Sequence, residues 1–214
     1  MDGMQHLFAA PTGIALGKVK ETQDPHSRGR VQVTLVAIGV DVWAACVVPS
    51  SANGYGIALL PKKDEMVLVA FLTPDQAFVL GSVWAGDSSQ PTEAAPVEQR
   101  YVIKTPKGTT LLFDDDGPSM SVTTPQSNSL TLTDAGGGSC TVQIGGTSIE
   151  AQPDSVTVTT GSSIQLQTST LTITAPSVTV DAAMSQFSGV VQCDTLIATT
   201  VVGTSYTPGA GNIW

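Results

Sequence analysis

Two short clusters contain residue types that could carry catalysis or bind a metal ion. Asp24, His26 and Ser27 have the side chains of a hydrolytic relay, but they lie in one short turn, which is poor geometry for such a relay. Asp114–Asp116 could coordinate Ca²⁺ or Mg²⁺ through carboxylate oxygens, but the ligand spacing of an EF-hand loop is absent. The sequence therefore favours two polar turns, with no catalytic residues and no metal ligands.

Charge is distributed very unevenly along the chain. Residues 108–214 contain no lysine, arginine or histidine and carry a net charge of −8, whereas residues 1–107 carry −1. Enzymes usually need general acids, bases or cation clamps, and nucleic-acid binders need Lys and Arg. The second half lacks the cations that both of these roles use, so the sequence favours a mechanical role there.

The first half shows the pattern of a small β-barrel. Short apolar or alternating runs are separated by turn residues between Gly13 and Trp84. The expected strands are Ile14–Lys20, Arg30–Val36, Val42–Val48, Glu65–Leu72 and Ala77–Trp84. Five short strands in about 70 residues predict a closed barrel. The Pro- and Ser-containing stretch that follows, Asp87–Pro96, predicts an extended linker.

Beyond Lys107 the sequence becomes repetitive. The first apolar residues of successive alternating runs fall at positions 142, 149, 156, 164, 171 and 178, at intervals of 7, 7, 8, 7 and 7. Three such runs add up to 22 residues, which predicts a three-sided coil with two apolar side chains per strand pointing inward. An ordinary meander of hairpins remains the alternative, although the sharp Asn-Gly and Asp-Gly turn signals are missing from 141–180.

A single chain wound in this way would enclose a thin core. Burying a Val or Leu contributes roughly 1.5–3 kcal/mol, whereas fixing the backbone of one residue costs roughly 1–2 kcal/mol. Two buried residues in every seven do not balance that cost, so we expect three chains to wind together as an intertwined homotrimer. The expected trimer core consists of Val142, Ile144, Val156, Val158, Ile164, Leu166, Leu171, Ile173, Val178 and Val180.

The first half also resembles a known family. The run Asp24–Val33 is followed by Trp43, then by Leu60–Phe71 and Phe78–Trp84. In order and spacing this resembles the gpV/gp5-type OB domain of phage baseplate central spikes, which VgrG proteins of type VI secretion share. The positions that match the family pattern are Gly29, Arg30, Trp43, Pro61, Asp64, Glu65, Phe71 and Gly81, and Lys63 stands where the family usually has Gly. The stretch Lys104–Asp115 resembles the start of the family's triangular β-helix.

The resemblance implies a fold, a function and partners. The chain is expected to be all-β: an N-terminal OB-fold barrel followed by an intertwined trimeric triangular β-helix, or β-prism. The expected division is a hub-contacting arm (1–11), the OB-fold domain (12–86), a linker (87–103), the needle (104–202) and a C-terminal tip segment (203–214). The implied role is a structural, non-enzymatic spike at the baseplate of a contractile tail or injection system. It would sit on a hub protein and be pushed through the target outer membrane.

The ends of the chain bear on localisation and on the tip. The N-terminus lacks the pattern of a signal peptide, so synthesis in the bacterial cytoplasm and assembly into a virion or injection particle are expected. Several gpV-like spikes bind iron through a terminal His-x-His pair; this chain has no His after His26, so no cofactor is expected. Tyr206, Pro208, Ile213 and Trp214 would instead dock a PAAR-type tip protein, the alternative being that Trp214 folds back on its own trimer.

Two other classes of function are weighed against the spike. One is a polysaccharide-degrading enzyme on a β-helix, for which the second half has carboxylates but no cations. The other is an OB-fold nucleic-acid-binding module with a stalk, which would use Trp43, Trp84 and basic side chains. Those basic side chains are Lys18, Lys20, Arg28, Arg30, Lys62 and Lys63. Acids nearly cancel their charge, so no nucleic-acid partner is expected.

Overall fold

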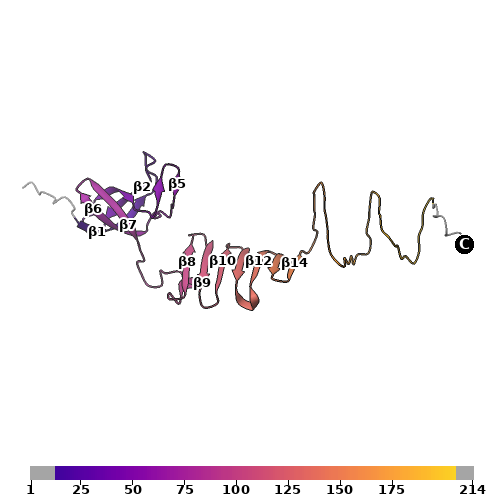
Figure 1. Ribbon diagram of the computed structural model, residues 1–214. Helices are drawn as coiled ribbons and strands as arrows, with labels where there is room; N and C mark the ends of the chain where they lie inside the picture. Colours follow the sequence, from indigo (N-terminus) through magenta and orange to yellow (C-terminus); the bar gives the residue numbers. More distant parts are fainter. Residues whose placement is uncertain (1–12, 206–214) are drawn as a thin grey trace, which may run out of the picture. The chain divides into compact units, whose positions relative to one another are not determined.

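The computed structural model describes residues 13–205, and in them the regular structure is β-strand with two short 3-10 turns (Figure 1). No helix in this part of the chain is long and apolar enough to cross a membrane. The prediction of an all-β chain is therefore confirmed for the residues described.

The first element of the fold is a closed five-stranded barrel in the order β1-β2-β3-β7-β6 (Figure 1). Its strands are β1 (Gly13–Glu21), β2 (Arg30–Leu35), β3 (Asp41–Cys46), β6 (Met66–Thr73) and β7 (Gln76–Val83). Neighbours pair antiparallel except β3 and β7, which run parallel. The predicted barrel and its five strands are confirmed. A small hairpin of two-residue strands, β4 (Ser51–Ala52) with β5 (Tyr55–Gly56), lies between β3 and β6.

The barrel has its own apolar core, built from small aliphatic side chains. Alternation along β2 buries Val31, Val33 and Leu35, each at most 1 % exposed, because successive side chains of a strand point to opposite faces. The other core residues are Val19, Ala44, Val67, Val69, Ala77 and Val79. Val, with its branched Cβ, is favoured in strands and fills a narrow barrel without large aromatic rings.

One glycine allows the barrel to close tightly. Gly17 lies on β1 opposite Leu35 of β2 and Val67 of β6. A Cβ built on Gly17 would lie 2.2 Å from Cγ1 of Val33, which is 0 % exposed. A side chain at this position would therefore displace the core.

The turn between β1 and β2 is organised by Asp24. Its carboxylate accepts hydrogen bonds from the backbone N–H of His26 (3.0 Å) and of Arg28 (2.9 Å). It also accepts from Nε (3.0 Å) and Nη2 (2.9 Å) of Arg30, whose guanidinium lies 5.5 Å from the centre of the Trp43 ring. The Asp24 side chain is 3 % exposed. The pair with Arg30, helped by the amide donors, holds the pKa of the Asp24 carboxyl well below its usual range.

The connection after the barrel is shorter than predicted. It contains the 3-10 turn η1 (Thr92–Ala94), where Glu93 pairs with Lys104 at 2.5 Å. The second sheet already begins at β8 (Arg100–Lys104), inside the segment assigned to the linker 87–103. Linker-like composition ends at Pro96, and Arg100 is held in the sheet by its bond to Asp114 (2.8 Å).

A second sheet of seven strands follows, and each strand pairs antiparallel with its neighbours in sequence (Figure 1). The strands after β8 are β9 (Thr110–Asp114), β10 (Ser119–Thr123), β11 (Ser129–Thr133), β12 (Ser139–Ile144), β13 (Thr147–Gln152) and β14 (Ser155–Thr159). A second 3-10 turn, η2 (Ala135–Gly137), lies between β11 and β12.

The strands from 141 to 159 lie where the repeat placed them, but their connection differs from the prediction. β12, β13 and β14 form hairpins in one sheet, which is the meander alternative, whereas a three-sided coil turning within one chain is wrong here. Two-residue turns at Gly145–Gly146 and Pro153–Asp154 suffice for reversal; Gly145 takes a φ of 55°, a conformation that Gly adopts readily. Residues 160–205 form no strand within a single chain.

We expect Gly17→Ala to destabilise the barrel. The new methyl group meets Val33 inside a packed core, and overpacking of this kind costs about 1–3 kcal/mol. The melting temperature followed by circular dichroism should fall by at least about 4 °C. Gly81→Ala in β7 is the matched control, because a Cβ there meets nothing within 4 Å. Equal melting temperatures for the two variants would contradict the close approach at Gly17.

We expect the contribution of Asp24 to depend on pH. A carboxyl whose pKa is lowered by folding stabilises the folded state above its unfolded pKa of about 4, and that contribution is lost as pH falls further. Asp24→Asn should lower the melting temperature by roughly 5 °C or more at neutral pH, and by progressively less below about pH 4. Asp75→Asn, in the exposed β6–β7 turn, serves as control. A deficit that is constant from pH 7 to pH 2 would refute the assignment.

Candidate assembly interface

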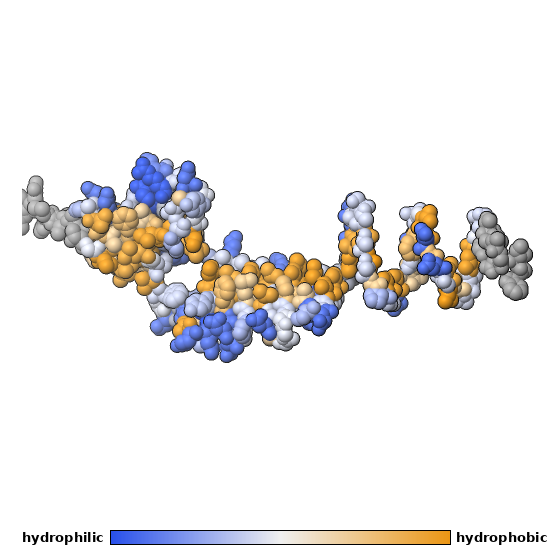
Figure 2. Space-filling model, in the orientation of Figure 1, coloured by the Kyte–Doolittle hydropathy of each residue, from blue (hydrophilic) through white to orange (hydrophobic). Residues whose placement is uncertain are grey.

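The seven-stranded sheet aligns its apolar residues into two unbroken rows on one face. Each strand alternates, and the antiparallel register sets two apolar positions of each strand opposite apolar partners on the neighbouring strands. The first row contains Ile103, Leu111, Val122, Leu130, Val142, Ile149 and Val158, and the second contains Tyr101, Phe113, Met120, Leu132, Cys140, Ala151 and Val156. We call these fourteen residues the apolar face; Figure 2 shows apolar side chains gathered in a band over this sheet.

The opposite face of the same sheet is polar from β10 onward. Its central row begins with Val102 and Leu112 on the first two strands. It continues through Ser121, Thr131, Thr141, Glu150 and Thr157. The two faces thus differ in the way expected of a sheet with one side in a core and the other in water.

None of residues 13–205 covers the apolar face within a single chain. Leu132 is 50 % exposed, Val158 47 % and Phe113 41 %, and no described residue from 100 to 205 is buried. The core of the barrel belongs to the barrel strands alone. Contiguous apolar surface of this extent marks a site of association, and a sheet is stable only when its apolar face packs against another layer.

The predicted core residues fall into two groups. Val142, Val156 and Val158 belong to the apolar face, and Ile144 shares it by alternation along β12. The other six, from Ile164 to Val180, are exposed in the strand-free segment, and their packing in a trimer stays a prediction. Sequence reasoning missed the part of the face that lies on β8 to β11. The alternation Met120-Ser121-Val122 and Leu130-Thr131-Leu132 was a signal that could have found it.

The family-signature residues of the barrel occupy structural positions. Gly29 takes a φ of 69° in the turn that Asp24 organises, and Arg30 links that turn to Trp43. Pro61 is buried, and Phe71 packs against the core. These five positions shape turns and core contacts, and they offer no reactive group.

The remaining signature residues lie around the start of β6. Asp64 takes a φ of 72° and pairs with Lys18 at 2.8 Å, which lowers the pKa of the Asp64 carboxyl. Glu65 accepts a hydrogen bond from Ser82 Oγ at 3.0 Å. Gly81 lies beside a register shift between β6 and β7. These residues tie β1, β6 and β7 together at one end of the barrel.

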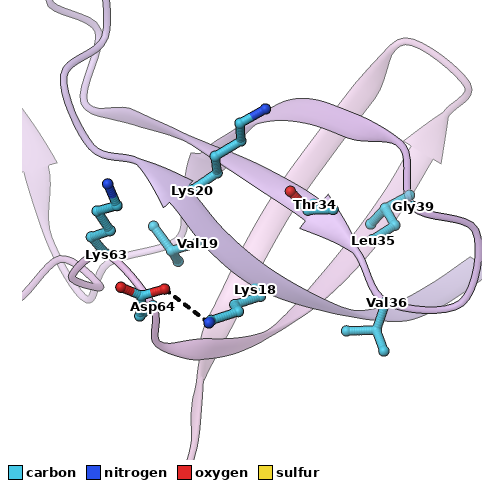
Figure 3. A pocket seen from close by; sticks show the side chains of 9 residues that line it. All are labelled: Lys18, Val19, Lys20, Thr34, Leu35, Val36, Gly39, Lys63 and Asp64. Carbon is cyan, nitrogen blue, oxygen red and sulfur yellow. Dashed lines mark ion pairs between the residues drawn. The ribbon is translucent and has the colours of Figure 1, made fainter.

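Basic residues gather at an open cavity of about 390 Å³ on the barrel, shown in Figure 3. Lys18 points toward Asp64 there, while Lys20 pairs with Asp41 and Lys63 lies at the rim. The pair with Lys20 and the hydrogen bond from Thr34 lower the pKa of Asp41. Most of the positive charge is thus matched locally by carboxylates, a poor arrangement for binding a phosphate backbone.

The two clusters whose residue types could support catalysis or metal binding, around Asp24 and around Asp114, instead make structural contacts. The Asp24 carboxylate is occupied by Arg30 and by backbone amides, including that of His26. Burial opposes ionisation of Asp114, but the amide of Asp116 and the guanidinium of Arg100 outweigh it, so the Asp114 pKa lies below its usual value. Among residues 13–205, no group of three or more His, Cys, Asp or Glu side chains could hold a metal ion. Tyr206, Pro208, Ile213 and Trp214 lie outside the described residues.

Comparison with known proteins bears on the barrel. A family model for the injector OB domain of type VI secretion systems and phage baseplates matches residues 15–84. A search of curated proteins found no match. The matched range covers all five strands of the closed barrel apart from the first two residues of β1. The family match and the closed five-stranded barrel therefore together support a gpV-like baseplate OB domain over residues 15–84.

Proposed function

We propose that this chain is the central spike of a baseplate, a homotrimer that pierces the target envelope by stiffness and not by catalysis. The baseplate OB domain gives the chain its association with an injection particle. The observation that carries the rest is the apolar face of residues 100–159, which no described part of the same chain covers. Three copies of that face, turned inward, provide the missing layer for one another.

Simple geometry favours three copies. Packed sheets lie about 10 Å apart, so each wall of a closed prism lies about 5 Å from its axis. For an equilateral triangle this corresponds to a side of about 17 Å, which equals five residues at about 3.4 Å each. Strands β9, β10, β11 and β14 are five residues long. Four such sheets would lie about 8.5 Å from the axis and leave a channel, and two would leave their long margins open.

The outer surface of the proposed prism fits passage through an envelope. Apart from Arg100 and Lys104 on β8, its side chains are mainly Thr and Ser with scattered acids, and residues 108–214 carry no basic side chain. Positive side chains bind anionic lipid with about 1 kcal/mol each. The part of the shaft beyond β8, which has no positive side chains, would lack electrostatic attachment to such a surface, and short side chains add little friction.

The partners of the spike follow from the same proposal. The OB domain would mount the trimer on a baseplate hub, as the family match to injector OB domains supports. The C-terminal segment around Trp214 would meet a PAAR-type tip protein, and the target envelope is the final partner. We propose no cofactor and no nucleic-acid partner. The pairing of Lys18 and Lys20 with carboxylates argues against nucleic-acid binding.

We expect Val158→Asp to abolish the trimer. The substitution brings three carboxylates into a shared apolar core, and burying unpaired charge is strongly unfavourable. Light scattering coupled to gel filtration should give three times 22.0 kDa for the wild type and one third of that mass for the variant. Thr157→Asp, one residue earlier on the polar face, is the matched control and should remain trimeric. A trimeric Val158→Asp variant, or a monomeric wild type at micromolar concentration, would refute the packing.

We expect lysines on the polar face to make the spike adhere to anionic membranes. The triple variant Thr131→Lys, Thr141→Lys, Thr157→Lys should co-sediment with phosphatidylserine vesicles, and salt should reverse this binding. The wild type should stay in the supernatant, and a triple Thr→Gln variant at the same sites should behave like the wild type. Sedimentation of the wild type to the same extent as the lysine variant would disprove the proposed role of the missing cations.

A further inference from the structure

The seven-stranded sheet has an apolar strand at its first edge. Among the described residues β8 pairs with β9 alone, so its other edge presents backbone N–H and C=O groups to which a strand of another molecule can add. The centre of β8 is the run Tyr101-Val102-Ile103, in which Tyr101 is 68 % and Ile103 46 % exposed. Aromatic and β-branched residues favour strands, and short segments of this kind are prone to edge-to-edge association. The β8 edge is therefore a place where two molecules could join.

The basic residues in the strands of this sheet are confined to the same edge strand. Arg100 and Lys104 lie at the two ends of β8, whereas β9 to β14 contain no lysine or arginine. If two copies of β8 paired antiparallel about Val102, Arg100 of one copy would face Lys104 of the other, and like charges directly opposite each other are destabilising. Charge on an edge strand opposes strand addition, but salt screens it. The cations therefore guard the edge only in part.

Both basic residues of β8 also hold the segment 91–96, which we call the strap. Lys104 Nζ donates to Oε1 of Glu93 at 2.5 Å, and Arg100 Nη1 donates to the backbone oxygen of Ala95 at 2.8 Å. The second contact joins a later residue of the strap to an earlier residue of β8, so the strap runs antiparallel to the strand. These contacts hold the strap at both ends of β8.

The strap is seated by a buried side chain and offers little to a further strand. Ala94 is 8 % exposed and lies in η1, which contacts β8, and it is the one buried residue among residues 80–205. The N–H groups of Ala94 and Ala95 bond within the strap, to the backbone oxygens of Pro91 (3.0 Å) and Thr92 (3.3 Å). The prolines at its two ends have no N–H. The strap thus covers β8 while leaving few N–H groups to which another strand could bond.

We propose that the strap is an autoinhibitory cover, which keeps the β8 edge of one particle from pairing with the β8 edge of a second particle. Two guards then protect the same edge: the strap blocks access to the backbone, and Arg100 and Lys104 repel an approaching copy. The inference goes beyond the spike proposal and does not depend on the number of chains in a particle, because the strap and its contacts lie within one chain. It also gives a reason why the strands of the sheet keep basic side chains on β8 alone.

Moving one carboxylate by a single position releases the strap. Glu93→Ala combined with Ala94→Glu keeps the composition and net charge of the chain, but it removes the ion pair with β8 and places a charge at the buried site, which is unfavourable. Amide hydrogen exchange of residues 92–99 should then become at least about tenfold faster. The matched control is Val97→Glu combined with Glu98→Val, because both of these side chains are exposed. It should exchange like the wild type.

Light scattering at two salt concentrations then tests the guard. In about 20 mM salt the strap-released variant should keep the wild-type mass, because the cations still repel each other. In about 0.5 M salt, where the screening length is about 4 Å, its mass should double and exchange of the Tyr101–Ile103 amides should slow. The wild type and the control should keep their mass at both salt concentrations. An unchanged mass at high salt, a doubling without protection of β8, or a strap that exchanges like the wild type would each overturn the proposal.

Glu93→Gln is a milder variant for the case in which the double change prevents folding. It removes only the ion pair with Lys104, so exchange of the strap should accelerate less, and the salt-induced doubling should need a higher protein concentration. The doubling is counted from the mass of the wild type, whether that is one chain or three. A monomeric wild type would therefore refute the spike and leave the test of the strap intact.

Discussion

An uncovered apolar face constrains everything that follows the barrel. Residues 100–159 form one antiparallel layer with two rows of apolar side chains, and a single layer cannot remove them from water. The sheet cannot supply a second layer itself, because each of its strands already pairs within the same plane. We propose that the second layer comes from other copies of the chain, because a narrow sheet of five-residue strands is suited to a triangular closure with two identical copies.

The two halves of the chain therefore differ in where their apolar side chains are buried. The barrel closes on itself, buries its core to near-zero exposure and organises its first turn around the Asp24–Arg30 pair. It can serve as a rigid mount whose surface meets other baseplate components. In the proposed trimer the second half would gain its core by association, so that its stiffness and its oligomeric state would have one physical origin. A spike of the proposed kind would need this coupling, because three chains would then share the load.

The polar side of the sheet and the charge distribution fit the same role. Thr and Ser on the outer face cannot drive further association, and the absence of cations from residues 108–214 limits attachment to anionic surfaces. Where titratable groups do interact closely, at Asp24 and Arg30 or at Asp114 and Arg100, they fix turns and the first strand of the sheet. Polar interactions in the described residues thus set local geometry, and the uncovered apolar surface supports the proposed assembly.

The local sequence determined the barrel strands, the strands and turns of 141–159, and the shared face of Val142, Val156 and Val158, because alternation and turn residues act over a few positions. It could not decide how those strands connect. A five-residue strand with a two-residue turn repeats every seven residues whether the chain reverses in a hairpin or continues around a corner. Only the backbone pairing between strands distinguishes a hairpin from a coil. The strand β8 was missed because Arg100 is held in the sheet by its partner Asp114, which is distant in the sequence. The tertiary structure decided the hairpins, the register that aligns the apolar face, and the edge at Thr159 where pairing within one chain ends.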